Sequence, residues 1–370
     1  MAATNNEHHD GLIVGGGVIG LACAWRAAER GLRVKLIERD RPGAGASNVA
    51  AGMLAPVGEA TFGEDRLLEL AIESHGLWRR FAADLASAAD QEIGYLDIGA
   101  LHVALDRDEA TELRRRFELM STLDLASQWL RPSGCRELEP GLGPVAAGVH
   151  APHEAAVDPR SLIAALVRAF EAAGGRIEIG EVTGALIESG RLAGVRTADG
   201  GEHRARATVL AAGSWSAAEW LPDEARPPIR PVKGQILTLR GARTEPVCER
   251  IVVTERVYLV PRTDGRLVVG ATVEEQGFDT RVTAGGVHEL LREAYRALPE
   301  VAELELVETI AGLRPVTPDN LPLIGAGAID GLVLATGHFR NGILLAPLTA
   351  QRIATALESA VLPATAGVAR

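Results

Sequence analysis

The segment that decides the fold is GLIVGGGVIGLACAWRAAERGLRVKLIERD, which spans residues 11–40. Its opening residues, 11–15, form a short unbroken apolar run, and such a run is typical of a buried strand. A helical pattern follows over residues 18–30 and stops at Gly31, after which residues 33–38 form a second apolar run. The order strand, helix, strand predicts a βαβ unit at the start of the chain.

The turn between the first strand and the helix has the spacing G-x-G-x-x-G, at Gly15, Gly17 and Gly20. In dinucleotide-binding proteins these glycines provide a tight turn, a close approach of the pyrophosphate and the packing of helix on strand. Glu38 ends the second strand eighteen residues after Gly20, where a carboxylate can accept a hydrogen bond from a ribose hydroxyl. The segment therefore predicts a dinucleotide site, but by itself it does not distinguish NAD from FAD.

Apolar runs of the same kind recur far from the first one. RATVLAAGSWS (206–216) and the run at 331–336 each predict a buried strand that enters a glycine turn. Hairpins predicted over 90–105 and 230–275 supply strands for a second sheet. We therefore expect an α/β fold, with a Rossmann-like dinucleotide-binding domain built from discontinuous segments and a mixed α+β substrate domain with an antiparallel sheet. The expected limits are 1–82, 150–222 and 311–370 for the first domain, and 83–149 and 223–310 for the second.

Charge and composition narrow the classes of partner. The 370 residues carry a formal net charge of −11, which disfavours nucleic acid and anionic membranes. The N-terminus lacks a basic region, and the apolar stretch over residues 12–25 is too short for a membrane span. The pattern His150-x-x-His153 has no evident further ligand, so we expect no metal. A cytoplasmic location without a disulfide framework is expected from three widely spaced cysteines, Cys23, Cys135 and Cys248.

The segment GHFRNGILLAP (337–347) favours FAD over NAD. If residues 331–336 are a strand of the nucleotide-binding sheet, this loop crosses the crevice at the strand ends, where ligands bind. We expect the following helix to begin near Gly342 and to direct its N-terminus, a partial positive charge, at the ligand. A reduced flavin carries negative charge at its N1–C2=O edge, and Gly342 has no side chain to hold the backbone away from the ring.

Several motifs together resemble the glycine oxidase (ThiO) branch of the D-amino-acid oxidase family of flavoproteins. The matching stretches span nearly the whole chain: GGGVIG (15–20), AAGML (50–54), PVKGQ (231–235), YLVPRTDGRLVVGAT (258–272), AGLRP (311–315) and GHFRNGILLAP (337–347). The first motif is shared widely, whereas the last is specific to this branch. The two-domain layout of the family agrees with the segments predicted above.

The resemblance implies FAD that is bound noncovalently. Related enzymes that attach FAD covalently use a cysteine late in the chain, and the last cysteine here is Cys248. The residues that the resemblance assigns to the cofactor are Gly15, Gly17, Val18, Ile19, Gly20, Glu38, Arg39, Ala46, Ser47, Ala51, Gly52, Met53, Val182, His338, Phe339, Arg340, Asn341, Gly342, Ile343 and Leu344.

The implied reaction is the oxidative deamination of glycine and of other small amines, such as sarcosine, or D-amino acids. Hydride passes from Cα to flavin N5, the imine hydrolyses, glyoxylate forms from glycine, and O2 is reduced to H2O2. The branch also implies that the imine supplies thiamine thiazole synthesis. Because the cofactor carries the chemistry, we name no catalytic side chain. Arg314 is expected to bind the substrate carboxylate with its planar guanidinium, together with Arg340 and the Tyr258 hydroxyl.

Two departures from the family pattern leave the preferred substrate open. Arg256 stands where a histidine is common two residues before the tyrosine, and Val273 stands where a methionine can follow GAT. A sarcosine oxidase or a D-amino-acid dehydrogenase of the same family is an alternative. A flavin-binding subunit without turnover is another, although the arginines and the tyrosine argue against it, and the acidic charge disfavours a tRNA-modifying flavoprotein. Structural ion pairs are the competing interpretation of Arg314 and Arg340, and a homo-oligomer is one option for assembly.

Overall fold

The N-terminal segment folds as the predicted βαβ unit. In the computed structural model, which describes residues 9–58, 63–123, 125–241 and 246–361, β1 (His9–Val14) leads through a glycine turn into α1 (Val18–Glu29) and on to β2 (Val34–Glu38). The two strands lie parallel. From its second residue onward β1 is buried, which accounts for the apolar run in the sequence.

The first sheet draws its other strands from distant parts of the chain: β8 (Arg176–Ile179), β9 (Val182–Glu188), β10 (Arg191–Thr197), β11 (Glu202–Leu210), β17 (Leu323–Ala326) and β18 (Leu332–Thr336). Its main order is β17-β18-β11-β1-β2-β8, and all of these pairs are parallel except β17 with β18. β9 and β10 continue from β11 as an antiparallel extension. The predicted Rossmann-like assembly from discontinuous segments is confirmed.

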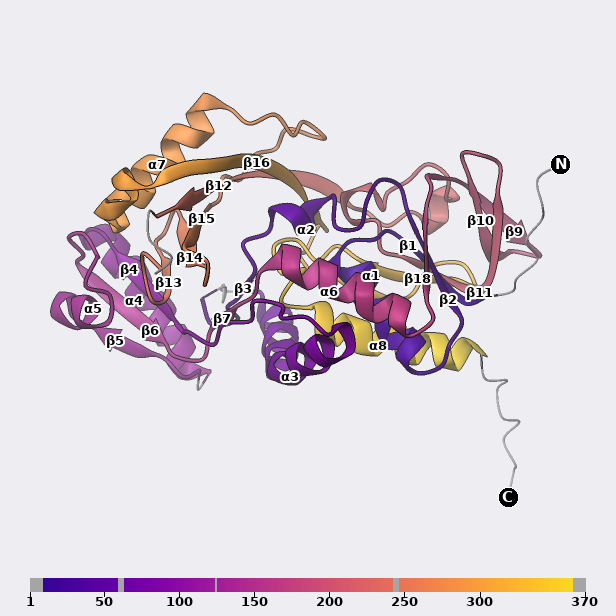
Figure 1. Cartoon of the computed structure of the whole chain (residues 1–370), viewed down its shortest axis with the longest axis horizontal. Helices are drawn as coiled ribbons and strands as arrows, with labels where there is room; N and C mark the ends of the chain where they lie inside the picture. The colour runs from indigo at the N-terminus through magenta and orange to yellow at the C-terminus, as the bar shows by residue number, and fades with distance from the viewer. Residues whose placement is uncertain (1–8, 59–62, 124, 242–245, 362–370) are drawn as a thin grey trace, which may run out of the picture.

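Four helices cover this sheet and pack against one another: α1, α3 (Asp65–Ala89), α6 (Pro159–Ala172) and α8 (Ala346–Val361) (Figure 1). The N-terminus of α6 is set by Asp158, whose carboxylate accepts hydrogen bonds from the backbone of Arg160 and Ser161. Trp25 of α1 and Trp78 of α3 each make an edge-on contact with Phe81. These aromatic contacts pack α1 against α3 within the apolar core of the first domain.

The second sheet has the order β16-β12-β15-β14-β13-β4-β6-β5, with bounds β4 (Ala100–Ala104), β5 (Gln128–Leu130), β6 (Ala147–Ala151), β12 (Arg230–Arg240), β13 (Ile251–Val253), β14 (Tyr258–Pro261), β15 (Arg266–Gly270) and β16 (Glu305–Val316). Its pairs are antiparallel except β13 with β4. The prediction of a hairpin over 90–105 is wrong, because that segment contributes β4 alone, which pairs with β6 and β13. The helices beside this sheet are α4 (Arg107–Thr122), α5 (Pro132–Leu138) and α7 (Ala284–Ala297).

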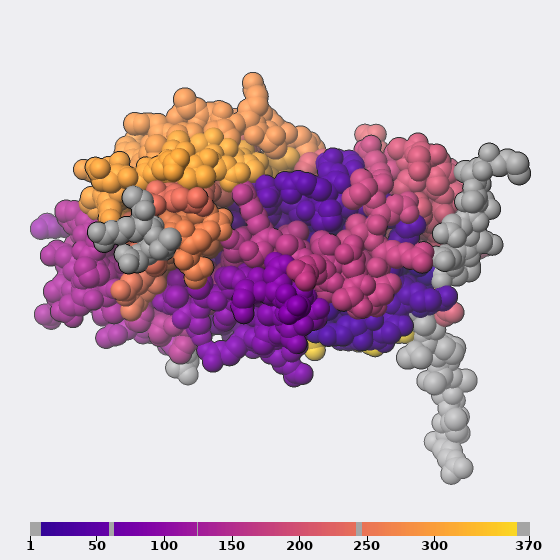
Figure 2. Space-filling view, viewed as in Figure 1, coloured from indigo at the N-terminus to yellow at the C-terminus, as the bar shows by residue number. Residues whose placement is uncertain are grey.

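Figure 2 shows an elongated molecule in which the second sheet and its helices occupy one end, while α8 is nearly hidden beneath the other. Short elements join the two ends: α2 (Ala46–Val49), β3 (Met53–Leu54) and β7 (Ala155–Ala156). A small apolar cluster that includes Val49, Ala51 and Ile236 connects them to the second sheet. The predicted domain limits stay a prediction, and β16 runs across the limit at residue 311.

Candidate cofactor and substrate site

A large cavity, of about 1030 Å³, lies where the two sheets meet. Its wall combines the turn before α1, the segment from α2 to β3, the loop after β18, and parts of β14 and β16. Sites for small ligands usually measure roughly 300–1,000 Å³, so this cavity has room for a dinucleotide with a small second ligand. Every predicted site residue lines it except Gly20.

The glycines of the first turn are needed for two different reasons. Gly15 has φ of +108°, and a Cβ there would lie 2.5 Å from the carbonyl oxygen of Ala211. A Cβ on Gly20 would lie 1.9 Å from the carbonyl oxygen of Gly15, so Gly20 serves the packing of α1. Gly17, at the N-cap of α1, lines the cavity and leaves its wall open.

Side chains from two later segments hold the first turn in place. Glu38 accepts hydrogen bonds from the backbone N–H of Gly16 at 2.6 Å and of Asp40 at 3.0 Å. Ser47 Oγ accepts one from the N–H of Val18 at 2.9 Å. Both oxygens of the Glu38 carboxylate therefore hold backbone groups around the turn, and Glu38 also lines the cavity.

An arginine on an indole ring forms another part of the wall. The guanidinium of Arg39 lies 4.8 Å from the ring centroid of Trp215, and both residues line the cavity with Val182. The sequence analysis did not select Trp215. Its motif, AAGSWS, offered a weak signal, because Trp215 follows the predicted strand by a few residues, and ligands bind at the carboxyl ends of the strands in such a sheet.

A buried arginine that the sequence analysis also missed supports the segment AAGML. Arg262 is 4% exposed, and its Nη2 donates to the carbonyl oxygen of Ala51. Its Nε lies 3.9 Å from Asp158 Oδ2. Burial lowers the pKa of Arg262 to about 10, and the Asp158 carboxylate opposes that shift, so the guanidinium stays charged. The available signal was an arginine that directly follows the apolar run Tyr258–Pro261.

The loop after β18 is held from behind by buried side chains. His338 Nε2 lies 3.0 Å from Thr349 Oγ1 of α8, and burial lowers the His338 pKa to about 3, so this ring is neutral. The carbonyl oxygen of Leu344 accepts hydrogen bonds from Ser74 Oγ at 2.7 Å and Trp78 Nε1 at 2.8 Å. These contacts fix the loop from the side opposite the cavity.

The prediction that a helix begins near Gly342 is wrong, because α8 begins at Ala346. The residues between them form turns. The backbone N–H of Leu345 donates to the carbonyl oxygen of Asn341, and the N–H of Ala346 donates to the carbonyl oxygen of Ile343. Proline is favoured in the first turn of a helix, where its missing N–H costs nothing, and Pro347 accordingly stands at the start of α8.

The cavity side of this loop presents unused donors. Within the part of the chain that the structure describes, the backbone N–H groups of Gly342, Ile343 and Leu344 have no hydrogen-bond acceptor. The nearest atom to a Cβ placed on Gly342 would be His338 Cβ at 3.8 Å, so no protein atom requires glycine there. A planar ring with acceptors on its edge fits both observations, since it would need the donors and the space.

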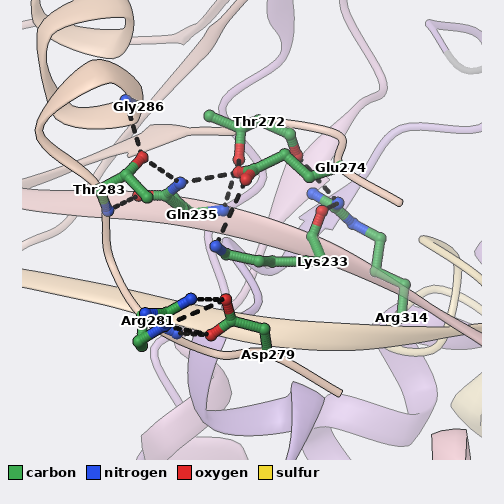
Figure 3. A network of polar contacts seen from close by, with 9 residues as sticks. All are labelled: Lys233, Gln235, Thr272, Glu274, Asp279, Arg281, Thr283, Gly286 and Arg314. Carbon is green, nitrogen blue, oxygen red and sulfur yellow. Dashed lines mark hydrogen bonds and ion pairs between the residues drawn. The ribbon is translucent and has the colours of Figure 1, made fainter. Parts of the chain in front are cut away.

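Two of the side chains predicted to bind the substrate, Arg314 and Tyr258, lie across glycines of neighbouring strands. A Cβ on Gly234 would meet Arg314 Nη1 at 2.3 Å, and a Cβ on Gly270 would meet the Tyr258 hydroxyl oxygen at 2.4 Å. Arg314 Nη1 donates to the carbonyl oxygens of Lys233 at 3.3 Å and Thr272 at 3.0 Å (Figure 3). These glycines thus explain parts of the motifs PVKGQ and GRLVVGAT.

The rest of the Arg314 guanidinium is available to a ligand. Among the described residues, no carboxylate oxygen lies within 4.0 Å of it, and Nε and Nη2 have no acceptor. The competing interpretation, a structural ion pair of Arg314, therefore finds no partner in the described ranges. The third predicted ligand, Arg340, comes from the loop after β18, where its guanidinium lies 5.3 Å from the ring centroid of Phe339.

The sequence pattern of one known family, described as FAD dependent oxidoreductase, matches residues 10–356. The chain belongs to this family. Its members use FAD, so the prediction of FAD is confirmed, while noncovalent attachment stays a prediction. A flavin is a planar ring with acceptors on its edge. The unused backbone N–H groups of residues 342–344 and the open space at Gly342 therefore suit this cofactor.

Individual relatives point to one branch of the family. The bifunctional protein ThiO/ThiG of Trichormus variabilis is 37% identical over 349 residues, and the chain spans 52% of its length. The crystal structure of glycine oxidase from Geobacillus kaustophilus has a TM-score of 0.89 and 34% identity, with 96% of this chain and 95% of that chain covered. The crystal structure of iminodiacetate oxidase from Chelativorans sp. BNC1 has a TM-score of 0.86 and 28% identity, with 96% of this chain and 97% of that chain covered.

Other groups that the sequence drew attention to lie outside the cavity. Cys23, Cys135 and Cys248 are free and buried, and burial raises the pKa of each thiol. His150 lies on β6, and the described residues contain no group of three or more side chains arranged to hold a metal ion. No helix in the described ranges is both long and apolar enough to cross a membrane.

Proposed function

We propose that this protein catalyses the FAD-dependent oxidative deamination of glycine and other small amines or D-amino acids, with release of glyoxylate from glycine and reduction of O2 to H2O2. The observation that carries the proposal is that Arg314, Tyr258 and Arg340 line the same cavity as the dinucleotide turn. Two cations and a phenol beside a flavin site suit a small substrate with one carboxylate.

The residues proposed to hold FAD divide between its two ends. The first turn, Glu38, Arg39, Ser47 and Val182 would hold the adenosine diphosphate part, and Ala51, Met53 and residues 338–344 would hold the flavin. Bound FAD would accept hydride from the substrate Cα and pass the electrons to O2. Noncovalent binding is supported by the burial of all three cysteines, of which Cys248 is the last.

The protein's own task is to place the substrate. The free edge of Arg314 would bind the carboxylate with two parallel hydrogen bonds, and the Tyr258 hydroxyl and Arg340 would hold its other sides. The strands under Arg314 and Tyr258 are buried and fixed, so the substrate Cα is held in one orientation. No side chain is needed as a general base, because the amine has only to be neutral when hydride leaves.

Product analysis tests the proposal. The purified protein should be yellow, should release its FAD on acid precipitation, and should form glyoxylate and H2O2 in equal amounts from glycine in air. A folded, FAD-loaded preparation that forms neither product from glycine, sarcosine or D-alanine would exclude the proposal. Flavin that remains with the precipitate would exclude noncovalent attachment of FAD but not the proposed reaction.

Likeness to the bifunctional protein ThiO/ThiG supports our inference that glycine imine formed by this protein supplies thiamine thiazole synthesis. The substrates proposed are glycine, sarcosine and D-amino acids, with O2 as acceptor and no nucleic acid or membrane as partner. A sarcosine oxidase or D-amino-acid dehydrogenase stays the alternative. The cytoplasmic location and a homo-oligomer also stay proposals.

One observation favours a second substrate class, secondary amines with two carboxylates. Arg256 lines the cavity two residues before Tyr258, and no described residue pairs with its guanidinium. The turn before β14 fixes its backbone, because Thr254 Oγ1 accepts the N–H of Arg256 at 3.1 Å and of Val257 at 3.0 Å. Likeness to iminodiacetate oxidase at 28% identity supports the same class.

The two substrate classes separate in one comparison. Arg256→Met should lower kcat/KM for iminodiacetate about tenfold or more, since one charge-assisted contact is lost. It should leave kcat/KM for sarcosine, which lacks the second carboxylate, nearly unchanged. Equal losses on both amines would exclude a specific contact between Arg256 and a second carboxylate.

A further inference from the structure

Lys233 is a lysine without a role in the site described so far. It lies on β12 in the motif PVKGQ, directly before the glycine under Arg314, and is 1% exposed. A fully buried lysine is rare and costly unless its charge is paired. Its partner is Glu274, whose Oε2 lies 3.3 Å from Lys233 Nζ (Figure 3).

Glu274 is held by more than the lysine. Its Oε1 accepts hydrogen bonds from Gln235 Nε2 at 2.7 Å and from Thr272 Oγ1 at 2.6 Å. Burial raises the pKa of Glu274, but hydrogen bonds from Thr272, Gln235 and Lys233 lower it by more than burial raises it. The pKa of Glu274 therefore lies below its ordinary value. The carboxylate is therefore charged, with one oxygen facing Lys233 and the other facing two neutral donors.

The network reaches Arg314 through the backbone of the same residues. Lys233 and Thr272, which hold the Glu274 carboxylate with their side chains, hold Arg314 Nη1 with their carbonyl oxygens. The N–H of Glu274 donates to that carbonyl of Lys233 at 3.0 Å. Arg314 thus lies beside the half-buried carboxylate of Glu274 but is held by neutral groups only.

We propose that Lys233 is a positioning residue for substrate binding, because it neutralises Glu274 and keeps that carboxylate away from Arg314. Without the ammonium, Arg314 would be a cation beside an unpaired Glu274 (Figure 3), and their ion pair would occupy the donors that the substrate carboxylate needs. The other carboxylate near Lys233, Asp279, already pairs with Arg281 at 2.9 Å. This inference rests on the proposed function in one respect, the binding of a substrate carboxylate by Arg314.

Charge compensation in paired variants tests the proposal. In the FAD-loaded protein, the perturbation of the flavin absorbance by acetate gives a Kd for a small carboxylate without turnover. Lys233→Met should raise this Kd about tenfold or more, because Glu274 then competes for Arg314. Lys233→Met combined with Glu274→Gln should restore the Kd to within about threefold of wild type. Glu274→Gln alone should not weaken acetate binding.

A matched control separates the effect from general loss of a buried lysine. Lys35 is 12% exposed and lies 2.5 Å from Glu178 in the first sheet. Lys35→Met should leave the acetate Kd unchanged, whatever it does to the melting temperature. A purely structural role of Lys233 predicts a double variant that is no better than the single one, and that result would overturn the proposal.

The remaining outcomes are also decisive. If Lys233→Met does not fold, weak acetate binding by a folded double variant overturns the proposal, and wild-type binding supports it. Arg314→Ala distinguishes failure of the proposed carboxylate site from failure of the positioning role of Lys233. If Arg314→Ala does not change the acetate Kd, the carboxylate site itself is excluded. If Arg314→Ala abolishes binding while Lys233→Met does not change it, only the positioning role is excluded.

Discussion

At the scale of single residues, three buried or half-buried cations have different tasks, which their contacts distinguish. Arg314 keeps the larger part of its guanidinium without a protein partner, as a binding group does. Arg262 uses its guanidinium on Ala51 and Asp158, as a structural group does. Lys233 pairs with Glu274 beside Arg314. The distinction follows from what each charge contacts, since all three lie near the same cavity.

The first residue-scale prediction concerns Arg314. Arg314→Lys keeps the charge but loses the planar fork, so glycine binding should weaken by roughly ten- to a hundredfold. Arg314→Ala should weaken it further. Steady-state kinetics on glycine measure the effect, and the FAD:protein ratio and melting temperature should barely change. An unaltered KM for glycine in folded, FAD-loaded Arg314→Ala would refute the carboxylate-binding role.

Arg262 should behave in the opposite way. Arg262→Met leaves the Ala51 carbonyl without its donor and removes a buried cation beside Asp158, which should cost roughly 3 kcal/mol of unfolding free energy. Thermal melts and FAD content measure the loss, while KM for glycine in the FAD-loaded fraction stays near wild type. Arg115→Met is the control, since its ion pair with Glu112 is exposed and should contribute less than about 1 kcal/mol. Equal melting temperatures for the two variants would contradict this role.

At the scale of elements, the turn before α1 and the loop after β18 use glycine differently. Protein atoms exclude any side chain at Gly20, because its Cβ would lie 1.9 Å from a carbonyl oxygen. At Gly342 the nearest protein atom to such a Cβ would be 3.8 Å away, so only a bound ring would exclude a side chain there. Stability and cofactor affinity should therefore separate between the two positions.

Gly342→Ala should yield a stable apoprotein with weak FAD binding. Alanine suits an ordinary backbone conformation and stabilises by about 0.4–1 kcal/mol through the unfolded state, while its methyl group would project toward the ring. FAD titration of the apoprotein should show an affinity lower by about tenfold or more. Gly20→Ala, the comparison variant, should lose stability first. Wild-type FAD affinity in Gly342→Ala would mean that the ring does not approach this loop.

Elements differ in how far the sequence could predict them, and the reason is the range of their contacts. The βαβ unit and the hairpin of β14 and β15, which lies within the predicted range 230–275, follow from patterns of neighbouring residues. Arg262 was missed because its partner Ala51 lies 211 residues away. The start of α8 was placed too early, because local apolar residues did not reveal the turns after Asn341. Arg314 and Tyr258 came only from motif resemblance, since no local rule marks a strand residue that lies over a neighbouring glycine.

At the scale of the whole molecule, the site exists only where the two sheets meet. The first sheet brings the dinucleotide turn and the loop after β18, and the second brings Arg314 and Tyr258. Neither sheet alone brings the proposed cofactor residues together with the residues proposed to bind the substrate carboxylate. The proposed function therefore requires that one cavity hold FAD and an amino acid together, with Cα facing the flavin.

Anaerobic reduction of the flavin by single substrates tests this claim most directly. In the absence of O2, glycine and sarcosine should bleach the flavin absorbance of the purified protein, and D-alanine should do so more slowly. L-alanine should not, because the carboxylate contacts and the fixed strands decide which face of Cα meets the ring. Rapid bleaching by L-alanine, or no bleaching by any of the other three, would contradict the proposed placement of the substrate Cα against the flavin.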